Sequence, residues 1–561
     1  MIDQQYDAIV VGSGISGGWA AKELTQKGLK TIMLERGKDV KHIIDYKSAN
    51  KNPWDFPHRG KRTQQMIKEY PVLQRDYPLN ELTLDWWANE QDCPYVEVKR
   101  FDWYRAYIVG GRSLLWGRHC YRLTDIDFEA NLKEGIATDW PIRYKELDAW
   151  YTYVEKFAGI QGKNEKWPSF PNGSLLPEMP LNCVEKDVAD RLNKFFKGKR
   201  IITNGRTANL SRPHQGRNAC QYRDKCSLGC PYGAYFSTQS STLPAAVETG
   251  NLTLRPFSIV TKILYDKDTQ KAIGVEVLDA ETNQTVEYKA KLVFLCASTL
   301  NSTWILMNSA TDIWPDGLGS SSGELGHNLM DHHFRCGASG EAEGFEDKYY
   351  YGRKPAGIYI PRFRNLYGDK RDYSRGFGYQ GNASRQNWQR NVAELGIGIS
   401  LKEALTEPGV WTMGIGAFGE ILPYHENKIS LDKNKKDKWG LPVLAVDAEI
   451  KDNEKKMRID MINDAAEMLE TAGLKNVATF DNGYGYGQAI HEMGTARMGR
   501  DPKTSVLNSH NQVWECKNVF VTDGAAMTSA SSVNPSLTYM ALTARAVDFA
   551  VNELKKGNLS S

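Results

Sequence analysis

The glycine-rich stretch near the start of the chain constrains the fold more than any other feature. Residues 6–11, YDAIVV, form a short apolar and β-branched run that predicts a buried parallel strand. This run leads directly into GSGISG at 12–17, which is a G-x-G-x-x-G sequence. A helical stretch follows, and then a second strand, KTIMLE, which ends in Glu35. Strand, glycine turn, helix and acidic strand end together predict a dinucleotide-binding βαβ unit.

Each glycine of this motif has its own physical task. Gly12 makes the tight turn, Gly14 lets the backbone approach a pyrophosphate, and Gly17 lets the helix pack closely on the strand. The helix N-terminus attracts phosphate charge, and Glu35 can accept a hydrogen bond from a ribose hydroxyl. The motif by itself does not distinguish NAD from FAD.

A similar strand end lies near the other end of the chain. Residues 519–524, VFVTDG, predict a strand that reaches Asp523. Asn534 and Pro535 then open a long helical pattern over 535–552, with the proline in the first turn. The sequence therefore places a second helix N-terminus in a loop that follows a strand end.

The stretch HEMGTARMG at 491–499 holds a histidine whose role the pattern alone does not assign. A zinc-binding H-E-x-x-H helix would need a second histidine four positions after His491, but Thr495 stands there. The two glycines of the stretch also disfavour a helix interior. Taken alone, the pattern favours a buried structural histidine.

Four stretches together resemble the glucose–methanol–choline (GMC) flavoprotein oxidoreductases. They are VGSGISGGWAAKEL near the start, VGGRSLLWG at 109–117, HEMGTARMG at 491–499 and VTDGAAMTSASSVNPSLTYMALTARA at 521–546. They stand in the family's order and span the chain. The resemblance implies FAD and a fold with an α/β Rossmann-like FAD-binding domain plus an α+β substrate domain with an antiparallel sheet.

The resemblance also implies roles for particular residues. His491 matches the family's catalytic histidine, and Asn534 matches its second active-site position. A neutral imidazole is a natural acceptor for the proton of an alcohol, which supports a general base at His491. The N-terminus of the last helix, at Pro535, could stabilise negative charge on reduced flavin. The further matches to cofactor-binding positions are Gly110, Gly111, Ser113, Val260, Asp523 and Gly524.

One departure from some relatives concerns how the flavin is held. Those relatives attach FAD covalently through a histidine that follows the Gly-Gly pair. The corresponding position in VGGRSLLWG is Leu115, which cannot form that bond. We therefore expect non-covalent FAD.

Three cysteines cluster in the stretch RNACQYRDKCSLGCPYGAYFST at 217–238. Cys220, Cys226 and Cys230 have the spacing C-x5-C-x3-C on a loop rich in Gly and Pro. From the spacing, free thiols, one disulfide with a spare thiol, or a metal site are all open, and zinc would need a fourth ligand such as His214. The loop resembles that of GMC sugar dehydrogenases with a 3Fe-4S cluster, which implies such a cluster on these three cysteines.

The 561 residues are too many for one core. We expect a discontinuous FAD-binding domain at 1–45, 96–140, 205–330 and 485–561, a substrate-binding domain at 331–484, and insertions at 46–95 and 141–204 that cap the site or contact a partner. Within the substrate domain, strands such as VWTMGIGAFGEILP, KISLD and VLAVDAEI predict an antiparallel sheet backed by helices. The adjacent His332 and His333 are expected to be structural.

Charge and hydropathy limit the partners. The 71 Lys and Arg nearly balance the 68 Asp and Glu, so no broad basic face for nucleic acid is expected. No apolar run is long enough to cross a membrane, and the first residues do not resemble a secretion signal. Relatives with this cysteine loop often pair with a small subunit that carries an export signal. The resemblance thus implies a periplasmic enzyme exported with a partner, or otherwise a cytoplasmic one.

The resulting hypothesis is an FAD-dependent dehydrogenase that oxidises a secondary ring hydroxyl of a sugar or glycoside. The stretches HEMGTARMG and NPSLT resemble the glucoside 3-dehydrogenase, gluconate 2-dehydrogenase and pyranose oxidase branches, and C3 of a glucoside is favoured. A cluster implies an external acceptor such as cytochrome c rather than dioxygen. The alternatives are gluconate 2-dehydrogenase or pyranose 2-oxidase activity, a non-catalytic flavoprotein electron carrier, and a zinc-binding interaction module on the cysteine loop.

Overall fold

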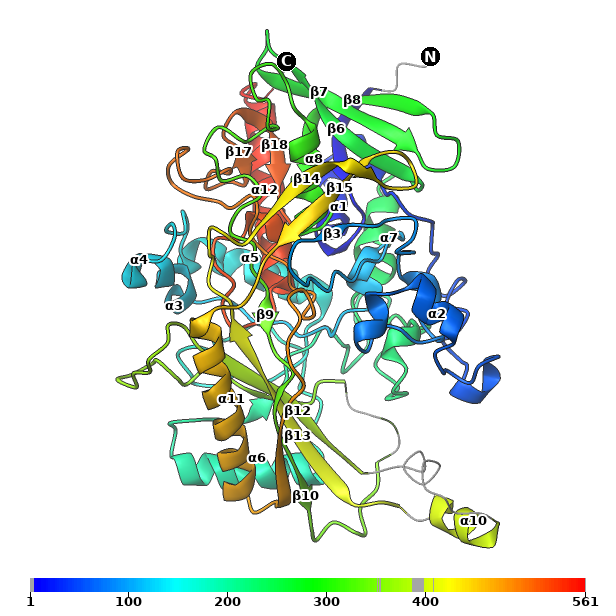
Figure 1. The fold of residues 1–561 in the computed structure, drawn as a ribbon, viewed down its shortest axis with the longest axis vertical. Coiled ribbons are helices and arrows are strands. Elements are labelled where there is room, and N and C mark those ends of the chain that lie inside the picture. Colours follow the sequence, from blue (N-terminus) through cyan, green and yellow to red (C-terminus); the bar gives the residue numbers. More distant parts are fainter. Residues whose placement is uncertain (1–4, 351, 353–354, 386–397, 407, 560–561) are drawn as a thin grey trace.

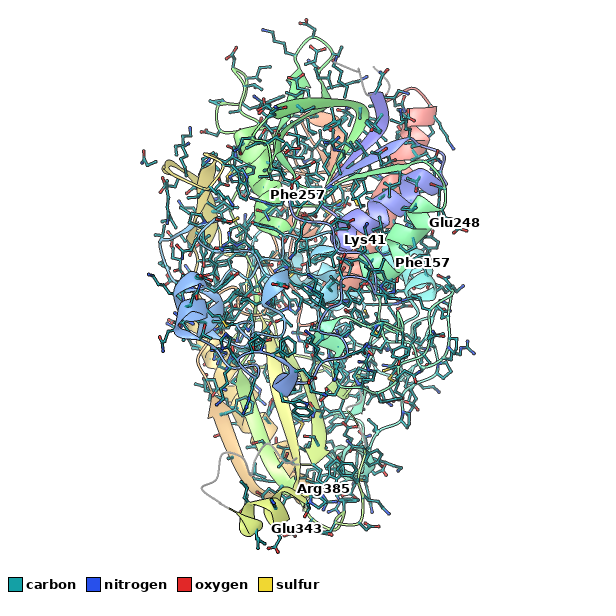
Figure 2. All side chains as sticks on the ribbon, turned by 90° about the vertical axis from the view of Figure 1, so that its right-hand side faces the viewer. Lys41, Phe157, Glu248, Phe257, Glu343 and Arg385 are labelled. Carbon is teal, nitrogen blue, oxygen red and sulfur yellow. The ribbon has the colours of Figure 1, made fainter. Side chains whose placement is uncertain are left out.

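The computed structural model describes residues 5–350, 352, 355–385, 398–406 and 408–559. The molecule is elongated, with an eight-stranded sheet in its upper half and a seven-stranded sheet in its lower half (Figure 1). Figure 2 shows that side chains fill the space between these layers, from Phe257 in the upper half to Arg385 and Glu343 at the lower end.

The upper sheet contains the predicted dinucleotide unit. Its order is β17-β18-β8-β1-β2-β5, and β7 pairs with both β8 and β6. The pairs among β18, β8, β1, β2 and β5 are parallel, whereas the β6–β7–β8 meander is antiparallel. The strands are β1 (Gln5–Val11), β2 (Thr31–Leu34), β5 (Leu252–Arg255), β6 (Ser258–Asp266), β7 (Lys271–Asp279), β8 (Thr285–Leu295), β17 (Gln512–Val513) and β18 (Cys516–Val521).

The parallel strands are buried on both faces, as their continuous apolar sequences predict. Ala8 and Val10 of β1 belong to the core shared with α1 and α12, whereas Ile9 and Val11 point into the main core on the opposite face. The helices α1 and α12 also pack against each other, so the two ends of the chain meet in one layer. The helices around this sheet are α1 (Ile15–Gln26), α7 (Leu243–Val247), α8 (Thr299–Asn308) and α12 (Ser536–Lys555).

The lower sheet is antiparallel throughout, in agreement with the predicted substrate domain. Alternate residues of β13, such as Met413 and Ile415, are buried, and α11 packs along β10, β13 and β16. This is the period-2 pattern of a sheet with one face against helices. The strands are β4 (Thr203–Asn204), β9 (His332–His333), β10 (Cys336–Ala342), β11 (Ile358–Ile360), β12 (Phe377–Arg385), β13 (Trp411–Glu420) and β16 (Lys475–Asp481), and the helices are α6 (Cys183–Phe196) and α11 (Asp452–Thr471).

One part of the predicted substrate sheet was wrong. The KISLD and VLAVDAEI segments form β14 (Lys428–Lys436) and β15 (Pro442–Asp447), which do not join the lower sheet. They form a separate three-stranded sheet in which β15 pairs in parallel with β3 (Val96–Glu97). In Figure 1 this sheet lies beside the upper half of the molecule. The alternation of apolar and polar residues predicts which side chains share one face of a strand, but it does not predict the neighbouring strand. The sequence therefore did not show that β14 and β15 belong to a sheet separate from the lower one.

The first predicted insertion consists mainly of short helices and turns, whereas the second contains the longer helices α5 (Tyr144–Ala158) and α6. Trp86 and Trp87 of the first insertion are buried, whereas Trp54 is exposed. The second insertion contributes β4 to the lower sheet. The remaining helices are α2 (Gln64–Glu69), α3 (Asp125–Phe128), α4 (Ala130–Glu134) and α10 (Ile399–Thr406). Among the described residues, each helix is too short or too polar to cross a bilayer.

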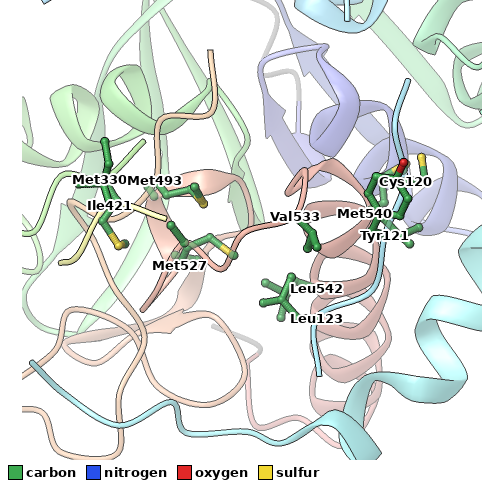
Figure 3. Packing of buried hydrophobic residues seen from close by; sticks show 14 of the residues in the cluster. Cys120, Tyr121, Leu123, Met330, Ile421, Met493, Met527, Val533, Met540 and Leu542 are labelled. Atoms are coloured by element: carbon green, nitrogen blue, oxygen red, sulfur yellow. The ribbon is translucent and has the colours of Figure 1, made fainter. Parts of the chain in front are cut away.

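A cluster of methionines packs between the two halves. Met330, Met493 and Met527 lie together beside Ile421, and all four are fully buried (Figure 3). The backbones of Met330 and Met493 form an antiparallel bridge, with N–H to O=C distances of 2.9 Å in both directions. This bridge fixes the register between two segments: the one that precedes β9 and the one that carries His491.

Candidate active site

A cavity of about 250 Å³ lies where the two ends of the chain meet. Its walls come from the glycine turn, the tip of β2, the 103–119 stretch, β6, the start of α8 and the start of α12. The predicted site residues that line it are Gly12, Gly14, Glu35, Gly111, Ser113, Val260, His491, Asp523, Gly524 and Asn534. Gly17, Gly110 and Pro535 do not line it.

The glycine turn has the geometry that the motif predicts. A Cβ on Gly17 would lie 1.9 Å from the carbonyl oxygen of Gly12, so this position holds the helix against the strand. Gly12 has a φ of +91° and lies against the backbone of Cys296. A Cβ on Gly14, in contrast, would meet no atom within 4 Å, so this glycine faces the open cavity at the N-terminus of α1. The turn therefore leaves a cradle for a phosphate group.

Glu35 closes the end of the cavity at the tip of β2. Its carboxylate accepts hydrogen bonds from the backbone N–H of Ser13 at 3.1 Å, from the Ser13 hydroxyl at 2.5 Å and from the backbone N–H of Gly37 at 3.0 Å. Burial raises the pKa of this carboxyl, although the same hydrogen bonds oppose the rise. The neighbouring Arg36 stacks over the ring of Tyr107 at 4.0 Å. Arg36 also lines the cavity, although no sequence motif singles it out.

The Gly-Gly loop packs on the glycine turn. The backbone N–H of Gly110 donates to the Ser13 hydroxyl at 2.9 Å, and the Ser113 hydroxyl donates to the Gly110 carbonyl at 2.6 Å. Ser113 also accepts a hydrogen bond from the backbone N–H of Thr238 at 3.0 Å. Gly110 is thus a structural member of the loop rather than part of the cavity wall. Leu115 does line the cavity, at the position that attaches flavin in some relatives.

His491 is half-buried and lines the cavity. Its Nδ1 lies 2.9 Å from Nδ1 of His332, and its Nε2 lies 3.4 Å from the amide nitrogen of Asn534. Burial lowers the pKa of His491 well below its usual range, and nearby charge on Arg112 lowers it further. The imidazole is therefore neutral at ordinary pH. The structure thus brings together the two residues, His491 and Asn534, that the sequence predicted as a pair.

A residue of the lower sheet orients Asn534. Gln380 on β12 donates from its amide nitrogen to the side-chain oxygen of Asn534 at 2.6 Å. Because that oxygen is occupied, the NH2 group of Asn534 is the end that faces His491. Gln380 was not singled out from the sequence, and no local pattern marks it.

Asp331 and the pair Arg112–Glu492 hold the segment around His491. Asp331 accepts hydrogen bonds from the backbone N–H of His491 at 3.1 Å and from the Tyr484 hydroxyl at 2.8 Å. Burial, followed by the charge of Glu492, raises the pKa of Asp331 to about 7. Arg112 binds Glu492 in a bidentate pair at 2.9 and 2.7 Å. Arg112 and Glu492 stand inside the GGRSLLWG and HEMGTARMG stretches, and Asp331 directly precedes His332, so their positions in or beside these stretches could have identified them.

Asp523 and Gly524 mark the strand end contributed by the C-terminal part. Asp523 accepts from the Ser302 hydroxyl at 2.5 Å and from the backbone N–H of Ala525 at 3.0 Å. Burial raises the pKa of Asp523 to about 6. A Cβ on Gly524 would lie 2.3 Å from the Thr299 hydroxyl, so only glycine allows α8 to approach here.

The cysteine loop lies outside the cavity. Cys220, Cys226 and Cys230 are free, half-buried thiols, and burial raises the pKa of Cys220 to about 11. Across the described ranges, no three side chains of His, Cys, Asp or Glu converge closely enough to hold a metal ion. The three thiols are nonetheless near enough for Cys226 and Cys230 to affect the pKa of Cys220 electrostatically. The 3Fe-4S cluster on these three cysteines therefore stays a prediction.

Several buried polar atoms around the cysteine loop have no hydrogen-bond partner within the part of the chain that the structure describes. Arg118 also lines the cavity, and its charge acts on Cys220. The loop is joined to this region by the backbone N–H of Cys220, which donates to the Leu210 carbonyl at 2.8 Å. The buried polar atoms without a hydrogen-bond partner in the described residues are Arg118 Nε and Nη1, Arg217 Nη1, Asn209 Oδ1 and Ser211 Oγ. Such a concentration fits a site for a polar or anionic group.

Sequence comparison identifies the family. Models described as GMC oxidoreductase match residues 6–334 and 423–543. The chain is 29% identical to 2-methyl-1,2-propanediol dehydrogenase of Mycolicibacterium austroafricanum, over 97% of this chain and 95% of that protein. It is 26% identical to the fructose dehydrogenase large subunit of Gluconobacter japonicus, over 98% of each.

The fold is also that of known members. The crystal structure of pyridoxine 4-oxidase from Mesorbium loti superimposes with a TM-score of 0.60 at 15% identity, covering 97% of this chain and 99% of the other. The residues of the cavity fit the cofactor of this fold, because Gly14 leaves an open cradle and Glu35 closes its far end. The chain therefore belongs to the GMC oxidoreductase family and is an FAD-dependent oxidoreductase that acts on CH–OH groups.

Proposed function

We propose that this protein is a sugar dehydrogenase that oxidises a secondary ring hydroxyl of a glucoside or another pyranose, with C3 favoured, to a keto-sugar. The observation that carries the proposal is the pair of His491 and Asn534 in the wall of the cavity. A neutral imidazole and an amide NH2 group, side by side, suit a substrate that loses a proton from oxygen as it loses a hydride from carbon.

The two side chains divide the work on the hydroxyl group. Nε2 of His491 takes the hydroxyl proton, which leaves the electron pair on oxygen to form the carbonyl as the hydride leaves carbon. The NH2 group of Asn534 donates a hydrogen bond to the same oxygen and stabilises its developing charge. FAD, when bound, supplies the hydride acceptor. Tyr77 and Trp87 line the cavity and can pack on the faces of a sugar ring.

The choice of a sugar is supported by the similarity to the fructose dehydrogenase large subunit and by the aromatic lining. It is tested by measuring dye reduction with methyl glucoside and with gluconate. We expect faster turnover of the glucoside and a 3-keto product, identified by NMR of the reaction mixture. Faster turnover of gluconate would favour the alternative gluconate 2-dehydrogenase activity, and oxidation at C2 of a free pyranose would favour a pyranose 2-oxidase type. A bound flavin that no sugar or alcohol reduces would favour a non-catalytic electron carrier.

We further propose that Cys220, Cys226 and Cys230 hold a 3Fe-4S cluster that passes electrons from the flavin to an external acceptor. Thiolate ligands suit iron–sulfur clusters, and the unpaired guanidinium atoms of Arg118 and Arg217 suit their negative charge. Arg118 lines the cavity and its charge acts on Cys220, so it is close to both the flavin site and the cysteine loop.

If the cluster carries electrons away from the flavin, its loss should slow the reduction of the external acceptor but not the reduction of the flavin by sugar. Cys220→Ser should abolish the EPR signal of the oxidised cluster and lower reduction of cytochrome c by at least about tenfold, because one of three ligands is lost. Reduction of bound flavin by sugar should be unchanged. Cys183→Ser, at a half-buried cysteine outside the loop, is the matched control. Iron-free protein that reduces cytochrome c at the normal rate would contradict the cluster.

The partners follow from the same proposal. The similar fructose dehydrogenase protein is named a large subunit, and this similarity supports the proposal that our protein also assembles with other subunits. We propose a small subunit with an export signal, a cytochrome c acceptor, and a periplasmic location reached by export with that subunit. Co-expression with and without such a subunit, followed by fractionation, tests this. Equal recovery of active enzyme from the cytoplasm in both cases would count against it.

The attachment of the flavin gives an independent prediction. Leu115 offers no nucleophile at the position that binds flavin covalently in some relatives. Acid precipitation should therefore release all of the FAD into the supernatant, as measured by its absorbance. As a control, Leu115→His should bind the same amount of FAD as the wild type. If part of its flavin resists acid precipitation, position 115 is the one at which a histidine can attach flavin covalently. Yellow colour that stays with the wild-type pellet would disprove non-covalent binding.

A further inference from the structure

His332 lies directly opposite His491 because of the methionine bridge. Met330 and Met493 pair as antiparallel partners, so the residues two positions after Met330 and two positions before Met493 come side by side. These residues are His332 and His491. Their rings are nearly perpendicular at 82°, and the two Nδ1 atoms are 2.9 Å apart.

The partners of His332 determine where its proton is. Its Nε2 lies 2.7 Å from the carbonyl oxygen of Ser531, which can only accept a hydrogen bond. In the neutral ring Nε2 therefore carries the hydrogen, and Nδ1 offers a lone pair. The ring is 1% exposed, and burial lowers its pKa to about 4, so it stays neutral at ordinary pH.

The same reasoning extends to His491. A hydrogen bond between the two Nδ1 atoms requires one hydrogen, and His332 has none at that atom. His491 must then carry its hydrogen on Nδ1, which leaves Nε2 with a free lone pair. Nε2 is the atom that faces the NH2 group of Asn534. The opposite tautomer of His491 would place two hydrogens against each other at Asn534 and two lone pairs against each other at His332.

We propose that His332 is a positioning residue that fixes the tautomer of His491, so that Nε2 is always the unprotonated nitrogen toward the substrate hydroxyl. This inference rests on the proposed role of His491 as the base. The chain of hydrogen bonds runs from the Ser531 carbonyl through His332 to His491 and so anchors the tautomer in the backbone. The sequence alone predicts a structural role for His332, and the contact of His332 with His491 gives this residue a more specific role.

The test uses the holoenzyme with 15N-labelled histidine. In the wild type, the 15N shifts of His491 should be pyrrole-type at Nδ1 and pyridine-type at Nε2, with assignment by comparison with His491→Ala. In His332→Leu, which removes the acceptor, the two shifts should move toward each other as the tautomers mix. His332→Gln can donate to Ser531 and accept from His491, so it should restore the wild-type pattern.

The kinetic consequence is measured by stopped-flow reduction of the bound flavin. His332→Leu should lower the limiting rate about 10- to 100-fold, part of the total contribution of a positioned base, and leave the substrate Kd nearly unchanged. His332→Gln should recover most of the rate. The matched control is His333→Leu at the next position, since neither ring nitrogen of His333 has a hydrogen-bond partner in the described residues. It should not affect the His491 shifts.

Two outcomes separate this inference from the proposed function. If His491 keeps the same 15N pattern and rate in His332→Leu, the positioning role is wrong while the base can still be His491. If His491→Ala reduces flavin at the wild-type rate, the proposed base is wrong, whatever the shifts show. Absorbance and thermal melting show whether His332→Leu still binds flavin and folds. If it does not, the 15N shifts and rate of His332→Gln are compared with those of the wild type instead.

Discussion

Replacing His491 with alanine should lower the rate of sugar-dependent flavin reduction about 10²- to 10⁴-fold, the usual contribution of a positioned general base. This corresponds to about 3 to 5 kcal/mol of transition-state stabilisation. Alanine removes the proton acceptor and leaves Asn534 to act alone. The measurement is anaerobic stopped-flow reduction of the bound flavin at saturating sugar, with FAD content determined beforehand.

The control for this experiment is a histidine with no contact to the cavity. His58 is exposed and forms hydrogen bonds through its backbone N–H and carbonyl, which alanine retains, so His58→Ala should keep the full rate. His491→Ala should also retain its FAD, because the cofactor cradle is built from the glycine turn and Glu35. Unimpaired flavin reduction by sugar in His491→Ala would remove this residue from the mechanism.

The pH dependence of the same reaction follows from the environment of His491. Burial disfavours the charged imidazolium, so the pKa of the folded protein lies well below that of an exposed histidine. The base therefore stays unprotonated as the pH falls through the range in which an exposed histidine titrates. Protonation of His491 should therefore not lower the reductive rate in that range. Asp331, whose pKa is raised to about 7, also titrates there, so the profile is compared with that of Asp331→Asn. A drop near the pKa of an exposed histidine that persists in Asp331→Asn would show that the pKa of His491 is not lowered.

Replacing Gly17 with alanine should prevent stable folding, whereas replacing Gly14 with alanine should mainly prevent FAD binding. The Cβ that Gly17→Ala introduces would lie 1.9 Å from the Gly12 carbonyl oxygen, and that backbone cannot move without separating α1 from β1. We expect a loss of about 3 kcal/mol or more in the free energy of unfolding. The gain of about 1 kcal/mol in helix propensity does not offset this loss.

Gly14→Ala is the matched comparison because its Cβ meets no protein atom within 4 Å. Its φ of −65° is also available to alanine. The apoprotein should unfold within about 1 kcal/mol of wild type, while the Kd for FAD should rise about tenfold or more, because the methyl group occupies the cradle. Thermal melting of both apoproteins and titration with FAD measure the two effects. Equal stability of the Gly17→Ala and Gly14→Ala proteins would show that the turn is not packed as described.

The dinucleotide unit could be predicted from the sequence because its signals are local. β1, the glycine turn and α1 follow one another between Gln5 and Gln26, and each has its own pattern of apolar residues or glycines. The pairing of His491 with Asn534 was also predicted, but through the resemblance of their motifs rather than through spacing. The structure agrees with both, since the two residues line one cavity with the glycine turn.

The partners of the strands and the contacts of His491 could not be predicted in this way. The sequences of β14 and β15 predict strands, as that of β13 does, and only the pairing of β15 with β3 assigns this hairpin to its own sheet. Gln380, which orients Asn534, is 154 positions away from it in the chain.

By itself, then, the sequence determined which segments are strands, helices and turns, and which of them are built for a nucleotide. Those properties depend on the chemistry of neighbouring residues. Only the tertiary structure decided which imidazole nitrogen of His491 is free, because that depends on His332, which is 159 positions away and is brought into contact by the packing of buried methionines. Sequence spacing carries no information about such a contact, since many registers between two distant segments bury the same apolar side chains.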